Sequence, residues 1–86
     1  MSNKETIVDE LIHNQSYYKE ILKHIQIKKD GLMIENPVEY SDEIRKQYKD
    51  TVSYIIAGIV SGKYGIAVGE TLSILSEIEL EEYLNV

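Results

Sequence analysis

The stretch that decides the fold is Thr51–Gly69, TVSYIIAGIVSGKYGIAVG. It contains no acidic residue and four of the five glycines, and the spacings Gly58–Gly62 and Gly65–Gly69 favour close helix approach or a turn. Elsewhere, charged residues interrupt the apolar ones every few positions. The large apolar side chains of this stretch leave little room for a solvated side; they are Tyr54, Ile55, Ile56, Ile59 and Val60. We therefore expect it in the centre of the fold.

Two secondary structures compete for this stretch. A helix is predicted by apolar residues that recur at spacings of three and four, namely Ile44, Tyr48, Val52, Ile55 and Ile59. This helix should stop near Ser61, at Gly62 or Gly65. The alternative is a hairpin over residues 52–68, because the segment is rich in β-branched residues and Ser61-Gly62-Lys63 could form a turn. The helix is favoured because its spacing is unbroken and charges do not alternate with apolar residues.

The start of this helix has two candidates. Asn36-Pro37-Val38-Glu39 places Asn at a cap, Pro at the first position and Glu at the third. Ser41-Asp42-Glu43 is a second possible start, which leaves open a single turn before the main helix. The preceding Leu32-Met33-Ile34 is too short to be an element of its own and is expected to run extended across the core.

A first helix is predicted over residues 3–28. Ser2 and Glu5 have the spacing of a capping box, and Gly31 can take the left-handed cap after the last turn. The apolar seam of this helix is Val8, Leu11, Tyr18, Leu22 and Ile25. Gln15 lies within the seam, where we expect it to bond to a residue across a helix pair.

The C-terminal segment, residues 66–84, is also helical in spacing. Its seams before and after Ser76 are rotated relative to each other, which favours a bend there, with Ser76 and Glu79 as a second capping pair. The predicted fold is therefore all-α: a small antiparallel bundle of three helices, with a possible short fourth.

The length of the chain predicts one domain, residues 1–86. Its composition has 43% apolar residues and no cysteine. Met1–Glu5 leads into a charged segment and not into a signal-peptide type of apolar stretch. The longest apolar run, Tyr54–Val60, is far shorter than the roughly 20 residues of a membrane span. We expect a cytoplasmic protein. Its abundant lysine and isoleucine are associated with bacterial or phage genomes.

Few residues suggest a catalytic, metal-binding or phosphate-binding site. His13 and His24 share a helix face but lie about 16 Å apart, too far to hold one metal ion. Glu10 and His13 have a di-iron bundle spacing, yet the sequence has no second Glu-x-x-His. Lys63, between glycines, does not match the order of a phosphate-binding loop. We therefore expect no enzyme, metal or cofactor.

The net charge of −6 disfavours nucleic acid and anionic lipid and favours a protein partner with a basic surface. Acidity can also serve solubility alone, and this alternative stays open. The best candidate for partner binding is a C-terminal cluster: Glu77, Glu79, Glu81, Glu82 and Tyr83. A second acidic group precedes or begins the central helix: Glu35, Glu39, Asp42 and Glu43.

The predicted function is that of a small acidic protein-binding module of the inhibitor, immunity, antitoxin or phage anti-defence type. The alternative is a homo-oligomeric helical adaptor without a charged target. A symmetric homodimer through the first helix is expected, because Ile7, Ile12 and Ile21 widen the apolar stripe of that helix beyond its seam. A strict monomer would instead leave this stripe for a foreign partner and favour the inhibitor type.

Overall fold

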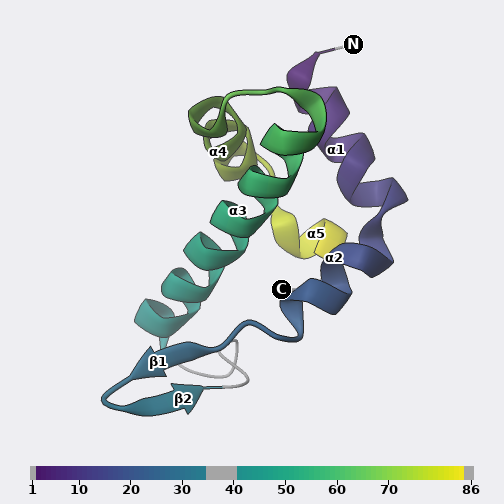
Figure 1. Cartoon of the computed structure of the whole chain (residues 1–86). Helices are drawn as coiled ribbons and strands as arrows, with labels where there is room; N and C mark the ends of the chain where they lie inside the picture. Colours follow the sequence, from purple (N-terminus) through teal and green to yellow (C-terminus); the bar gives the residue numbers. More distant parts are fainter. Residues whose placement is uncertain (1, 35–40, 85–86) are drawn as a thin grey trace.

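The computed structural model describes residues 2–34 and 41–84 and shows five helices and one hairpin in these ranges (Figure 1). The elements are α1 (Asn3–His13), α2 (Gln15–Leu22), β1 (Ile27–Lys29), β2 (Leu32–Ile34), α3 (Asp42–Tyr64), α4 (Val68–Glu77) and α5 (Leu80–Leu84). The chain is mostly helical, as expected, but a bundle of three helices is not what forms.

The predicted first helix is divided in two. Its start is confirmed, because the Ser2 hydroxyl oxygen accepts a hydrogen bond from the Glu5 amide at 3.1 Å. At Asn14 the backbone leaves the helical region, with φ −116° and ψ 30°. The Asn14 side-chain amide donates to the Glu10 carbonyl at 3.4 Å, a local bond of the kind by which asparagine competes with helix formation. The periodicity continues across this break, so sequence spacing could not reveal it.

The prediction was also wrong at the C-terminal end of this helix. The helix ends at Leu22, and Ile27–Lys29 pairs with Leu32–Ile34 as an antiparallel hairpin. The register places Ile27 opposite Ile34, and both side chains are buried. Asp30 and Gly31 form the two-residue turn with φ values of 53° and 81°. An Asp-Gly pair favours such a turn because both positions need positive φ. Leu32–Ile34 is extended as expected, but it pairs as a strand.

The central helix is confirmed. α3 follows Ser41, whose extended backbone is typical of a cap residue, and it ends at Gly65 with φ 70°. The Gly65 amide donates to the Ser61 carbonyl at 2.9 Å, which closes the last turn. The hairpin alternative over residues 52–68 does not form. The candidate start at Asn36–Glu39 lies outside the described residues.

The core uses the predicted stripe of α3 in the first half of the helix, where Ile44, Tyr48 and Val52 are buried, and a neighbouring stripe in the second half. Val52, Ile56, Ala57 and Val60 are fully buried, whereas the predicted Ile55 and Ile59 are half-buried. Tyr54 is 64% exposed, so the expectation that this stretch has no solvated side is wrong. The reason is the arrangement of the other helices, which leave one side of α3 uncovered (Figure 1). Adjacent stripes of one helix share the same spacing, and packing alone selects between them.

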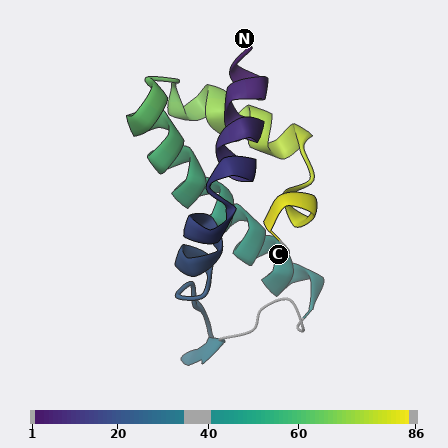
Figure 2. The ribbon, with the colours of Figure 1, turned by 90° about the vertical axis from the view of Figure 1, so that its right-hand side faces the viewer.

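The C-terminal segment bends as predicted. α4 ends at Glu77, Ile78 is extended, and α5 begins at Leu80. The expected Ser76–Glu79 cap does not form, because the Ser76 hydroxyl donates instead to the Ser73 carbonyl at 2.6 Å. The bend brings α5 beside α1 and α2 (Figure 2). There the Gln15 side-chain amide donates to the Tyr83 carbonyl, which confirms the expected cross-helix bond.

Candidate functional site

The corner between α4 and α5 carries most of the predicted C-terminal acidic cluster on the surface. Glu77, Glu79 and Glu82 are exposed, and Glu81 and Tyr83 are half-buried. Glu81 accepts a hydrogen bond from the Lys49 ammonium of α3. This bond is the main reason why the pKa of the Glu81 carboxyl lies below its ordinary value.

The acidic side chains of α2 and α3 each lie beside a basic side chain. The pairs are Glu20 with Lys23 at 3.2 Å, Asp42 with Arg45 at 3.6 Å, Glu43 with Lys29 at 3.6 Å and Asp50 with Lys46 at 3.3 Å. By contrast, no cation within residues 2–34 and 41–84 forms an ion pair with Glu77, Glu79 or Glu82. The corner therefore carries local negative charge that the described chain does not compensate.

An open hollow of about 330 Å³ lies beside this corner, between α3 and the segment that links α4 to α5. Carboxylates and hydroxyls supply hydrogen-bond acceptors on its wall: Asp50, Ser53, Ser76, Glu79 and Glu81. Leu75, Ile78 and Leu80 supply the apolar part, and Lys49 is the cation among the lining residues. Acceptors around an apolar wall suit a side chain with an aliphatic stem and a cationic end.

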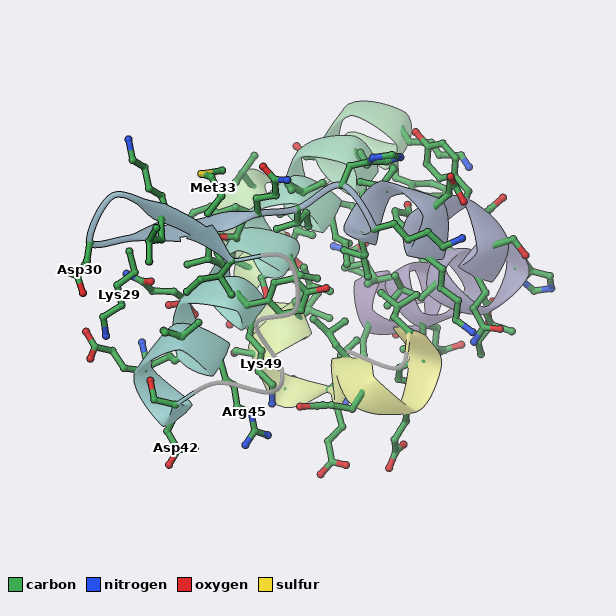
Figure 3. The ribbon with its side chains drawn as sticks, turned by 90° about the horizontal axis from the view of Figure 1, so that it is seen from below. Lys29, Asp30, Met33, Asp42, Arg45 and Lys49 are labelled. Carbon is green, nitrogen blue, oxygen red and sulfur yellow. The ribbon has the colours of Figure 1, made fainter. Side chains whose placement is uncertain are left out.

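The second acidic group has a different environment. Glu35 and Glu39 lie outside the described residues, and Asp42 and Glu43 are exposed at the start of α3. Figure 3 shows Asp42, Arg45 and Lys49 along one side of α3, with Lys29 near the tip of the hairpin. The described members of this group are thus mixed with cations, and they do not add to the uncompensated charge of the corner.

A buried carboxylate that the sequence analysis missed lies on α1. The Glu10 side chain is 4% exposed and is surrounded by three donors. Lys63 donates to its two oxygens at 2.9 and 3.1 Å, Tyr64 donates to Oε1 at 2.6 Å and Tyr18 donates to Oε2 at 2.8 Å. Two sequence features could have indicated it. Glu10 has helical spacing to the buried Ile7, and Lys63 is the lone cation of an acid-free stretch.

The three hydrogen-bond partners keep Glu10 ionised. Burial acts to raise the pKa of the Glu10 carboxyl, but hydrogen bonds from Tyr64, Lys63 and Tyr18 outweigh it, and the pKa lies below its ordinary value. The same bonds raise the pKa of Lys63 and of Tyr64, and burial with the Glu10 bond raises that of Tyr18. With four donor contacts on two oxygens, the carboxylate is saturated. It suits a structural role better than proton transfer.

The residues considered for metal binding are not gathered. His13 and His24 are exposed, and the His13 Nδ1 lies 2.8 Å from the Asp9 carbonyl oxygen. His24 lies 3.8 Å from Glu20, as a surface helix pair. Within the ranges that the structure describes, no group of three or more potential ligands is placed to hold a metal ion.

The three residues of the first helix that were predicted to form a dimer interface differ in how far they are exposed. Ile7 is fully buried in the core and so cannot contact another molecule. Ile12 is 51% exposed, and Ile21 is half-buried. The predicted wide stripe is thus reduced on the surface to Ile12 and part of Ile21, because α1 turns Ile7 toward the other helices.

None of the helices in the described ranges has both the length and the apolar character needed to cross a membrane. No family model, curated protein or solved structure matches this chain. The assignment of function therefore rests on the residues and their geometry.

Proposed function

We propose that this protein is a stoichiometric protein-binding module that uses the α4–α5 corner to contact a basic surface of a protein partner. Inhibitors, immunity factors, antitoxins and phage anti-defence proteins act in this way. The observation that carries the proposal is the set of three exposed carboxylates, Glu77, Glu79 and Glu82, which have no cation in the described part of the chain.

Electrostatics gives this corner two properties suited to binding. Like charges within six residues repel one another, so a basic partner relieves a local cost that the free protein carries. A net charge of −6 also attracts a basic partner over distance and raises the rate of association at low salt. The half-buried Tyr83 adds the kind of side chain that is enriched where binding energy concentrates.

The hollow beside the corner supplies a specific contact. A lysine or arginine side chain of the partner can lay its methylene groups against Leu75 and Ile78 and direct its cationic end to Glu79 and Asp50. This role needs no catalytic group. It is also consistent with a saturated Glu10, which is left to stabilise the fold.

The proposal is tested by comparing two variants with equal net charge. In the test variant, Glu77, Glu79 and Glu82 are changed to Gln. In the control, Glu5, Glu20 and Glu70, which are also exposed but lie on other surfaces, are changed to Gln. Each protein is immobilised and exposed to lysate of the native host, and retained proteins are identified by mass spectrometry and then titrated in purified form.

A partner that binds wild type and control but loses at least about tenfold in affinity for the test variant would support the proposal. Binding should also weaken as salt rises from about 50 to about 500 mM, because salt screens exposed charges. Equal binding of all three proteins, or retention that is insensitive to salt, would show that the acidic corner is not the contact surface.

A further inference from the structure

The hollow of about 330 Å³ beside the α4–α5 corner has polar residues on two walls that are distant in sequence. One wall is α3, which contributes Asp50 and Ser53. The other wall runs from the end of α4 to the start of α5 and contributes Ser76, Glu79 and Glu81. Each of these side chains has oxygen atoms that accept hydrogen bonds. A group that enters the hollow therefore meets acceptors from both walls.

The charges around the hollow leave one carboxylate without a cation. Glu81 is bonded to Lys49, and Asp50 pairs with Lys46 at 3.3 Å through one oxygen, Oδ2. Glu79 is exposed and forms no ion pair within residues 2–34 and 41–84. Three carboxylates thus stand against two ammonium groups, and the remaining negative charge matches a single cationic side chain. Charge complementarity selects such a side chain as the occupant.

The distribution of the acceptors favours arginine over lysine. A guanidinium presents five donors in a planar fork, so it can bond to Asp50 and Glu79 on opposite walls at once. An ammonium has three donors around one compact charge. The guanidinium is also more weakly hydrated, so it costs less to bring it against the apolar part of the lining, which is Leu75, Ile78 and Leu80.

We infer that this hollow is an arginine-binding site, in which an arginine side chain of the partner protein bonds to Glu79 and Asp50. Its methylene groups lie against Ile78, which is half-buried, because Leu75 and Leu80 are themselves almost fully buried. The assignment rests on the proposed role of the corner in binding a basic protein. It adds that the corner discriminates between the two basic side chains at this one place.

Blocked single amino acids test the site without a partner protein. N-acetyl-arginine amide and the lysine and citrulline equivalents are titrated to about 100 mM at constant ionic strength against the isotope-labelled full chain, and NMR follows the backbone amides. Arginine should saturate with a dissociation constant at least about fivefold below that of lysine. Citrulline, which has a similar shape but no charge, should not saturate. The shifts should concentrate at Ser53, Ile78 and Glu79.

Two pairs of variants separate the hollow from the general charge of the corner. Glu79→Gln should weaken arginine binding at least about fivefold, whereas Glu82→Gln, which removes the same charge from the corner outside the hollow, should weaken it less than about twofold. Ser76→Leu should weaken binding at least about threefold without any change in charge, because it fills space in the hollow. Its control is Ser73→Leu, which is exposed on the same helix but does not line the hollow. Melting temperatures check that each variant is folded.

Three results would overturn the arginine site: no saturation by arginine, equal binding of arginine and lysine, or equal weakening by Glu79→Gln and Glu82→Gln. None of them would decide the proposed function, because the corner can contact a basic partner through Glu77 and Glu82 alone. That function is decided by the comparison of the two triple-glutamine variants. Loss of partner binding there, together with equal binding of arginine and lysine here, would leave an acidic contact surface without an arginine site.

Discussion

The carboxylate of Glu10, on α1, accepts a hydrogen bond from the hydroxyl of Tyr64, the last residue of α3, at 2.6 Å across 54 residues of sequence. Tyr64 as a residue is 43% exposed, although its hydroxyl is bonded to a carboxylate that is buried. With the bond from Tyr18 of α2, this carboxylate joins three helices at one buried point. A buried anion with such bonds is costly to disturb, because its partners replace the water that it has lost.

Removing the Tyr64 hydroxyl should destabilise the protein. Tyr64→Phe keeps the ring but deletes a hydrogen bond to the buried Glu10 carboxylate, so the urea concentration at the midpoint of unfolding should fall. Tyr54→Phe is the control, since the Tyr54 hydroxyl makes no hydrogen bond in the described part of the chain, and it should change stability by less than about 0.5 kcal/mol. Urea unfolding measures both. Equal losses would mean that the Glu10–Tyr64 bond adds nothing to stability.

Glu10 should make the free energy of unfolding depend on pH in the acidic range. Because the pKa of the folded-state Glu10 carboxyl lies below the ordinary value of 4.5, the folded state favours the ionised form. This contribution is fully present above the unfolded pKa and is lost as pH falls through the folded pKa. The difference in unfolding free energy between wild type and Glu10→Gln should therefore shrink as pH falls from about 6 toward about 3. A difference that is constant over this range would contradict an ionised, stabilised Glu10.

Two neighbouring isoleucines should differ in their contribution to the core. Ile56 is fully buried, so Ile56→Ala should cost roughly 2–4 kcal/mol through lost burial and a residual cavity. Ile55 is half-buried, and Ile55→Ala should cost less than about 2 kcal/mol. Thermal or urea unfolding of the pair decides which stripe of α3 faces the core. A larger loss at Ile55 would place the core on the other stripe.

Two glycines near the end of α3 should respond to alanine in opposite directions. Gly65 has φ 70°, a conformation that a side chain strains, so Gly65→Ala should cost about 1 kcal/mol. Gly62 is helical with open space around it, so Gly62→Ala should stabilise the monomer by about 0.5–1 kcal/mol. Melting temperatures at low protein concentration test both signs. A stabilising Gly65→Ala would show that α3 does not end in this left-handed cap.

Several local features of this chain, although not the hairpin turn at Asp30-Gly31, were predicted from its sequence. The Ser2–Glu5 cap, the span of α3 to a glycine cap at Gly65 and the bend after α4 all follow from residues within a few positions of one another. Such features depend on backbone hydrogen bonds and helical spacing, which neighbouring residues determine. The Gln15 bond to α5 was also expected, because a polar residue within an apolar seam needs a partner.

Tertiary structure decided the features that depend on distant residues. The spacing of Ile55 and Ile59 is the same as that of Ile56 and Val60, and only the packing of other helices selects the buried pair. Glu10 appears in the sequence as one more surface acid, because its partner Lys63 lies 53 residues away. The acidic corner likewise differs from the paired acids of α3 only through which cations the fold brings near. The sequence alone determined the mostly helical content, the start of α1 at Ser2 and the end of α3 at Gly65, whereas long-range packing determined which faces are buried, because burial is a property of neighbours in space.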